Sequence, residues 1–221
     1  MVIEAILLDH GNVLSRNSGP DIPQIIEFFK KRYNLDLKPG EVKRTLEQTI
    51  SPLQEGNVSA EYFWKVFFEK LNIQLPQEGH FPTKEYESIW PRLGVIYRDL
   101  SALNPESISL IYFLKPKVSK IGLLSNSIKP LGEINRFEGI YDYFGKNVFL
   151  SYELGFKKPK QEAYQISCSR MGVQPESTLF IDDSMKNVEG ARECGLIAIR
   201  FDAGVQPYED LRKELKFLGI F

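Results

Sequence analysis

Five short apolar runs, each ending where a polar or acidic loop begins, constrain the fold of this chain more than any other feature. Runs that are apolar along their whole length are typical of parallel strands that helices cover on both faces. Helical patterns separate the later runs, and this alternation predicts a doubly wound α/β parallel sheet, a Rossmann-like core. The predicted strands are residues 2–8, 118–124, 148–150, 178–181 and 197–201, and the helices between the later ones are 107–114, 161–171 and 185–194.

The region after the first run breaks this alternation. No second strand is predicted between Leu14 and Val118, and amphipathic helical stretches separated by turn signals take its place. We interpret this region as a small α-helical cap domain inserted after the first strand, with its aromatic residues as the core of a helical bundle. The predicted division is 1–15 and 92–221 for the α/β core and 16–91 for the cap, whose helices are 22–33, 39–50, 59–75 and 83–90.

Composition and charge narrow the class of protein. A chain of 221 residues can bury a core and carry an insertion, and its 43% hydrophobic content is ordinary for a globular protein. The net charge of −1 comes with scattered Lys and Arg, so no basic stripe indicates a nucleic-acid partner. No stretch approaches the roughly 18 uninterrupted apolar residues of a membrane span, and the first residues do not resemble a signal peptide. We therefore expect a cytoplasmic protein without a membrane partner.

Two acidic clusters follow predicted strands, where ligands bind in doubly wound sheets. Asp9 comes directly after the first strand and is followed closely by Gly11, so its carboxylate suits attack on phosphorus or binding of a cation. A turn-capping aspartate is the alternative for this cluster alone. Asp182 and Asp183 follow the fourth strand, and adjacent carboxylates need a compensating cation. Oxygen-only ligation with few protein carboxylates favours Mg²⁺.

Two further clusters carry groups that suit an anion. Ser125 and Asn126 follow the second strand at a predicted helix start, which is typical of an anion site and equally of an ordinary helix cap. Lys158 stands before Pro159 and a predicted helix, so it can place a fixed positive charge at the site. A solvated lysine pair in a turn is the alternative for Lys158.

Together and in this order, the four clusters resemble the signature of the haloacid dehalogenase superfamily. The resemblance covers nearly the whole core and is most specific from Leu150 to Leu196. The first motif is similar to that of a subgroup that reads Asp-x-Gly-Asn-Val, which includes bacterial glucose-1-phosphate phosphatase-like proteins and is akin to the phosphatase domain of epoxide hydrolases. The position of the helical insertion also matches the cap of that family.

The resemblance implies a Mg²⁺-dependent phosphatase that hydrolyses a small phosphorylated metabolite, with a sugar phosphate as one candidate. Asp9 would be the nucleophile that forms an aspartyl-phosphate. Ser125, Asn126 and Lys158 would bind the phosphoryl group, and Ser125 and Lys158 would also be catalytic. The metal ligands would be Asp9, the backbone carbonyl of Gly11 and Asp183, with Asp182 supporting the site indirectly.

Gly11 departs from the pattern of most phosphatases of this superfamily. They carry a second aspartate there as general acid and base, a role typically worth about 10²–10⁴-fold in rate. His10 should point away from Asp9 along an extended segment, so we interpret it as structural. Two alternatives stay open, a weakly active or inactive protein that binds a phosphorylated ligand or partner, and a metal-independent haloacid dehalogenase. The sequence specifies neither the substrate nor the oligomeric state.

Overall fold

The computed structural model describes residues 2–15, 22–73 and 102–220. Their element order places three helices between the first strand and the rest of an α/β arrangement. The strands are β1 (Ala5–Leu8), β2 (Lys120–Ser125), β3 (Val148–Leu150), β4 (Thr178–Asp182) and β5 (Ile197–Arg200). The α-helices are α1 (Ile22–Tyr33), α2 (Pro39–Gln54), α3 (Ala60–Lys70), α5 (Pro105–Leu114), α6 (Lys129–Phe137), α7 (Ser151–Leu154), α8 (Gln161–Met171), α9 (Met185–Glu193) and α10 (Tyr208–Phe217), and 3₁₀ turns occupy Lys115–Lys117, Asp142–Phe144 and Pro175–Ser177.

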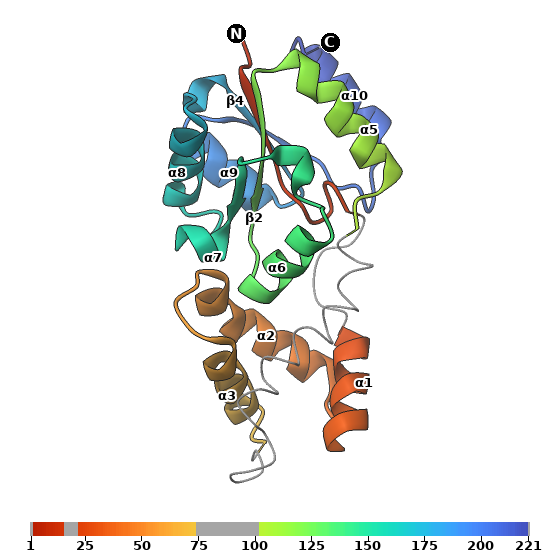
Figure 1. The fold of residues 1–221 in the computed structure, drawn as a ribbon. Coiled ribbons are helices and arrows are strands. Elements are labelled where there is room, and N and C mark those ends of the chain that lie inside the picture. Colours follow the sequence, from red (N-terminus) through yellow and green to blue (C-terminus); the bar gives the residue numbers. More distant parts are fainter. Residues whose placement is uncertain (1, 16–21, 74–101, 221) are drawn as a thin grey trace.

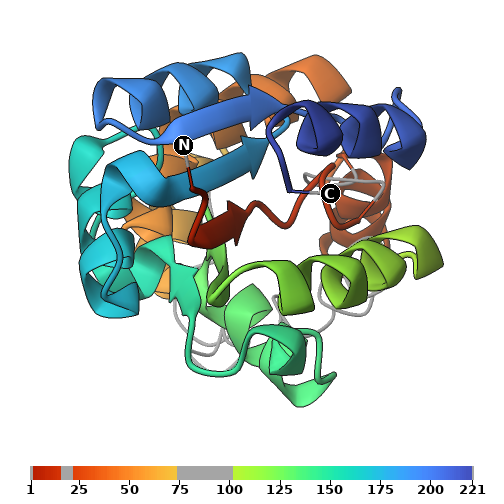
Figure 2. The same cartoon turned by 90° about the horizontal axis from the view of Figure 1, so that it is seen from above.

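The five strands form one parallel sheet in the order β3-β2-β1-β4-β5. The chain therefore builds outward from the central β1 in one direction and then in the other, which is the doubly wound topology predicted from the sequence. Figures 1 and 2 show helices on both faces of this sheet. Because all strands run the same way, their carboxyl ends meet at one edge, which in Figure 1 faces α1–α3.

Alternating residues of β1 supply the two layers of the core. Ile6 and Leu8 pack with residues of α5 and α10, whereas Ala5 and Leu7 pack with residues of α7, α8 and α9. All four side chains are fully buried, as a strand covered by helices on both faces requires. This explains why the strand is apolar without alternation.

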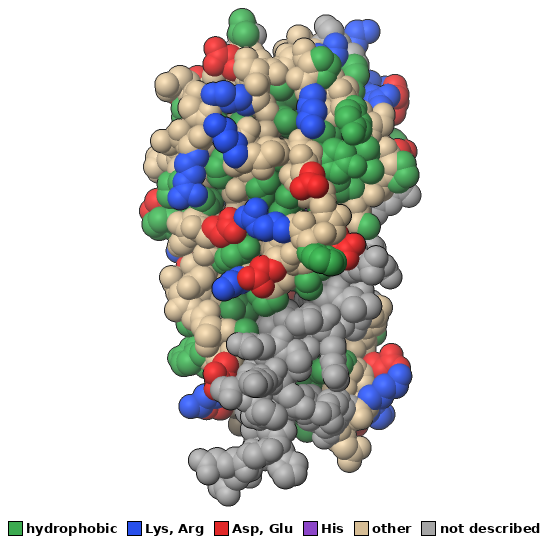
Figure 3. Space-filling model, viewed as in Figure 1, with side chains coloured by type: hydrophobic (Ala, Val, Ile, Leu, Met, Phe, Trp, Pro, Cys, Tyr) green, Lys and Arg blue, Asp and Glu red, His purple; other side chains and the backbone are tan. Residues whose placement is uncertain are grey.

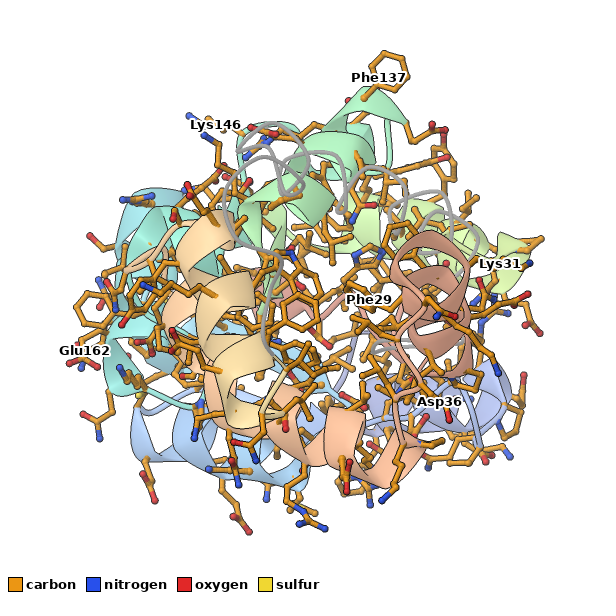
Figure 4. All side chains as sticks on the ribbon, turned by 90° about the horizontal axis from the view of Figure 1, so that it is seen from below. Phe29, Lys31, Asp36, Phe137, Lys146 and Glu162 are labelled. Atoms are coloured by element: carbon orange, nitrogen blue, oxygen red, sulfur yellow. The ribbon has the colours of Figure 1, made fainter. Side chains whose placement is uncertain are left out.

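Helices α1, α2 and α3 have a hydrophobic cluster of their own. Phe29 of α1 and Trp64 of α3 are fully buried and meet edge to face with ring centroids 5.3 Å apart. Figure 4 shows Phe29 pointing inward between these helices, while Lys31 and Asp36 point outward. Ile128, which follows β2, joins this cluster and ties it to the α/β core. Of the predicted domain limits, those beyond residue 15 lie outside the described residues, so the division into core and cap stays a prediction.

Helix limits follow local signals that the sequence shows in part. Asn104 caps α5 by accepting a hydrogen bond from the N–H of Ser107 at 2.8 Å, and Gly172 ends α8 in the left-handed conformation. Helix α2 runs to Gln54, past the predicted end at residue 50, because Pro52 lies in its last turn and removes only one hydrogen bond. Helix α3 ends at Lys70, before the predicted residue 75.

No helical range was predicted for α6, α7 or α10, and the predicted helix 83–90 lies outside the described residues. Figure 3 shows basic side chains scattered among acidic ones on the face it presents. Within the described part of the chain, every helix is too short or too polar to cross a membrane.

Candidate active site

The structure brings four of the predicted site residues into contact or near contact at the carboxyl edge of the sheet. Asp9 follows β1, Asp182 ends β4, and these two strands are hydrogen-bonded neighbours. Asp9, Asp182 and Asp183 each offer an oxygen that lies within 4.8 Å of those of the other two. Lys158 reaches the same place from the segment between α7 and α8. Residues 149 positions apart in the chain, Asp9 and Lys158, thus become direct partners.

Lys158 uses its three ammonium protons on three oxygens. Its Nζ donates to Oδ1 of Asp9 at 2.5 Å, to Oδ2 of Asp182 at 2.6 Å and to the carbonyl of Leu124 at 2.8 Å. The side chain is almost wholly buried, with 2% of the residue exposed. A lysine with every donor engaged is rigidly placed, and its charge lies against both Asp9 and Asp182.

Burial and charge shift the acidity of these groups in opposite directions. Burial raises the pKa of the Asp9 carboxyl to about 7, Lys158 opposes this rise, and the negative charge of Asp182 adds to it. Burial by itself lowers the pKa of Lys158, but Asp182 and Asp9 more than offset this, so the net shift is upward. Burial also raises the pKa of Asp183. Lys158 is therefore charged, and its charge opposes the rise in the pKa of Asp9 that burial causes.

Asp182 and Asp183 differ in what their oxygens contact. Asp182 is fully buried; its Oδ2 accepts from Lys158, and its Oδ1 accepts from the N–H of Ser184 and from Nδ2 of Asn187, both at 2.9 Å. Asp183 is partly exposed, and its Oδ2 accepts from Nδ2 of Asn12 at 2.9 Å. Among the described residues, no donor meets the other oxygen of Asp183. Asp182 thus positions Lys158, and Asp183 keeps an oxygen available for a ligand.

Ser125 and Asn126 occupy the end of β2 beside this group. Ser125 is buried, with 7% of the residue exposed, and its hydroxyl makes no hydrogen bond to any described residue. The side chain of Asn126 makes two hydrogen bonds to the backbone of Lys158. Its Oδ1 accepts from the Lys158 N–H at 2.8 Å, and its Nδ2 donates to the Lys158 carbonyl at 3.0 Å. Asn126 therefore positions the lysine, and its predicted contact with phosphate stays a prediction.

The loop after β1 turns tightly at Gly11 and Asn12. Asn12 has a φ of 53°, and the N–H groups of Leu14 and Ser15 both donate to the carbonyl of His10. His10 is buried and meets the ring of Tyr141 edge-on, with centroids 6.1 Å apart. The packing of His10 against Tyr141 agrees with the structural role predicted for it. The Gly11 carbonyl stays a predicted metal ligand.

A close backbone approach fixes the segment that carries Lys158. A Cβ atom at Gly190 of α9 would lie 2.8 Å from both Cβ and the carbonyl oxygen of Pro159. Only glycine lets the helix pack this tightly. The peptide bond between Lys158 and Pro159 is cis.

The turn between α2 and α3 packs on this same segment. Lys160 pairs with the buried Glu55 at 2.7 Å, and Lys157 donates to Oε1 of Gln54 at 3.2 Å. A Cβ atom at Gly56, whose φ is 68°, would lie 2.5 Å from the carbonyl oxygen of Tyr152. These contacts place the helical insertion directly over the lysine segment.

The donor set fits a magnesium ion. Three carboxylates lie together with one lysine as their charged partner, which leaves an excess of negative charge in a buried place. All the candidate ligand atoms are oxygens, the donors that Mg²⁺ takes. Burial is the main cause of the raised pKa of Asp9, and the charges of Asp182 and Asp183 add to it.

The fold and this site define a doubly wound α/β protein with a buried aspartate directly after its first strand, inside a group of three carboxylates. The chain belongs to the haloacid dehalogenase-like hydrolases, whose family model matches residues 3–195. It is 29% identical over 226 residues to D-ribitol-5-phosphate phosphatase of Bacteroides thetaiotaomicron, with 97% of each chain covered. It is also 30% identical over 113 residues to glyceraldehyde 3-phosphate phosphatase of Methanocaldococcus jannaschii, of whose length it spans about half (48%).

Solved structures show the same fold. A family enzyme from B. thetaiotaomicron in complex with magnesium and inorganic phosphate matches with a TM-score of 0.68 and 24% identity, over 95% of this chain and 98% of that one. The L-2-haloacid dehalogenase of Xanthobacter autotrophicus matches with a TM-score of 0.60 and 18% identity, over 100% of this chain and 85% of that one. Both confirm the predicted Rossmann-like architecture.

Sequence reasoning gave no role to several residues that shape this site. Arg200 donates from Nε to the carbonyl of Asp183 at 2.8 Å, and Glu55 and Lys160 connect the insertion to the core. No local pattern marks these residues, since each acts on a partner far away in the chain. The side chain of Asn12 was also given no role, although asparagine is one of the residues enriched at positive φ in tight loops.

Proposed function

We propose that this protein is a Mg²⁺-dependent phosphatase that hydrolyses a small phosphorylated metabolite through an aspartyl-phosphate on Asp9. The observation that carries the proposal is the buried Asp9 carboxylate, held by Lys158 at 2.5 Å inside a trio of acidic side chains. Family membership and the phosphatases among its relatives support the reaction type. A polyol or sugar phosphate is the substrate class that the two named relatives favour.

Each proposed catalytic residue has a task that its surroundings permit. One oxygen of Asp9 attacks phosphorus and forms the acyl phosphate while the alkoxide departs and takes a proton from water. Lys158 holds Asp9 in orientation and favours its ionised form. The unengaged hydroxyl of Ser125 is available to donate to a phosphoryl oxygen. A water molecule then attacks the acyl phosphate, which releases inorganic phosphate and restores Asp9.

Magnesium would be held by Asp9, Asp183 and the Gly11 carbonyl, and when bound it would supply positive charge to the phosphoryl oxygens. Asp182 would support the site through Lys158, because both of its oxygens are already engaged by protein donors. The proposed roles of Asp182 and Asp183 differ because their hydrogen-bond partners differ.

The test is activity on p-nitrophenyl phosphate during a Mg²⁺ titration, with wild type and Asp9→Asn compared. We expect Mg²⁺-dependent turnover in wild type and none in the variant, because a neutral amide is a poor nucleophile. Asp36→Asn is the matched control, since Asp36 is exposed outside the site and should behave as wild type. Turnover of a haloacid without metal would favour the dehalogenase alternative. Binding of phosphate without turnover would favour a non-catalytic protein.

A further inference from the structure

Asn12 makes two contacts that neither the family resemblance nor the proposed reaction assigns. Its Nδ2 donates to Oδ2 of Asp183 at 2.9 Å, across 171 positions of chain. Its backbone carbonyl accepts from the N–H of Ala203, in the loop after β5. Asn12 therefore links the loop that carries Asp9 to the loop that carries Asp183.

We propose that Asn12 is a positioning residue of the metal site, which holds Oδ2 of Asp183 and thereby turns the other oxygen toward the cation. The inference rests on the proposed function, since it takes Asp183 as a ligand. Asp183 is partly exposed just after its strand, so without this amide no hydrogen bond from a described residue would fix the orientation of its carboxylate. Partners that orient a metal ligand are commonly worth about 10- to 100-fold in affinity.

The backbone at this position explains why asparagine is required. A φ of 53° is open to glycine and, among other residues, mainly to asparagine and aspartate. Glycine has no donor for the Asp183 carboxylate. Aspartate would add a further negative charge to a site that already holds three carboxylates. Asparagine combines the left-handed conformation with a neutral donor.

The main chain around both ends of this contact is held independently of the amide. Arg200 donates from Nε to the carbonyl of Asp183 at 2.8 Å. Tyr208 of α10 donates its hydroxyl to the carbonyl of Val13 at 2.5 Å and accepts from Nδ2 of Asn104 at 3.1 Å. With both backbones fixed in this way, loss of the amide should free the rotation of one carboxylate and leave the loops in place.

The experiment compares Asn12→Gly with wild type in the full chain. Glycine keeps the positive φ and deletes only the amide, so the two roles of Asn12 are separated. The matched control is Asn34→Gly, since Asn34 has a φ of 55° and is exposed outside the site. The readouts are Mg²⁺ binding by calorimetry and the rise in thermal unfolding temperature that Mg²⁺ produces. We expect Asn12→Gly to bind Mg²⁺ roughly 10- to 100-fold more weakly and the control to bind as wild type.

The rise in unfolding temperature is measured from each variant's own metal-free value, so it reports Mg²⁺ affinity even if the variant is less stable. A smaller rise for Asn12→Gly supports the inference, and a rise equal to that of wild type overturns it. Failure of the proposed function looks different: wild type would bind Mg²⁺ and hydrolyse no phosphate ester. If wild type is an active Mg²⁺-dependent phosphatase and Asn12→Gly binds Mg²⁺ normally, only the inference on Asn12 is wrong.

Discussion

Replacement of Lys158 by methionine should destabilise the protein far more than a surface lysine replacement would. Lys158 is 2% exposed and is in contact with two carboxylates, at 2.5 and 2.6 Å. Methionine fills a similar space but leaves the Asp9 and Asp182 carboxylates facing each other without a cation. Removal of one partner from a buried ion pair typically costs about 3–5 kcal/mol. Since domains are stable by only about 5–15 kcal/mol, this loss is a large fraction of the total.

The assay is urea unfolding of metal-free protein, with the free energy of unfolding extrapolated to water. Lys157→Met is the matched control, because the adjacent Lys157 is partly exposed and donates its hydrogen bond to the neutral side chain of Gln54. We expect a loss of about 3–5 kcal/mol for Lys158→Met and less than about 1 kcal/mol for Lys157→Met. Excess Mg²⁺ should restore part of the loss, since it brings positive charge to the same carboxylates.

A double variant tests the cause of this loss. Addition of Asp9→Asn to Lys158→Met removes one of the uncompensated charges, so the double variant should be more stable than Lys158→Met alone. Equal losses for Lys158→Met and Lys157→Met, or a double variant that is less stable still, would refute the argument from buried charge.

Three further predictions concern the metal, the leaving group and the packing. Asp183→Asn should raise the Mg²⁺ concentration for half-maximal activity more than Asp182→Asn does. Asp182→Asn should lower kcat at saturating Mg²⁺, because it weakens the contact that positions Lys158. Equal, metal-independent losses in both variants would reject these roles. Because Gly11 offers no general acid, kcat/KM should fall steeply from aryl phosphates through anomeric sugar phosphates to primary-alcohol phosphates; a flat series would show that another group supplies the proton. Gly190→Ala should lower the free energy of unfolding by about 1–3 kcal/mol, because the new methyl group meets Pro159 at 2.8 Å. A Cβ atom at Gly40 of α2 would meet nothing within 4 Å, so Gly40→Ala should raise the free energy of unfolding by about 0.5–1 kcal/mol. Equal changes in the free energy of unfolding in urea for the two variants would contradict the packing argument.

The strands of the α/β core and its helices α5, α8 and α9 could be predicted because their signals are local. The run before Asp9 is apolar throughout and becomes β1, covered on both faces. The predicted helices 22–33 and 161–171 coincide with α1 and α8. Helices α6, α7 and α10 were missed. Helix α7 has only four residues, too few to show a helical period, whereas α6 and α10 each have one buried face in the structure. Residues of α6 and α10 pack against partners outside their own helices. Gly132 of α6 lies against Tyr152, and the hydroxyl of Tyr208 of α10 donates to the carbonyl of Val13.

The sequence by itself determined the sheet, the strand ends and the residue types that gather there, because hydrophobic periodicity and motif order are properties of neighbouring residues. The tertiary structure alone decided what each polar group does. It engaged every donor of Lys158, directed Asn126 to the lysine backbone and gave Asp182 and Asp183 different partners. Before the structure, only the family resemblance distinguished the adjacent aspartates Asp182 and Asp183. Their hydrogen-bond partners differ because successive side chains leave a strand end in different directions and meet different neighbours. Hydrogen bonds depend on distances of about 3 Å between atoms, and only the folded chain sets such distances between segments far apart in sequence.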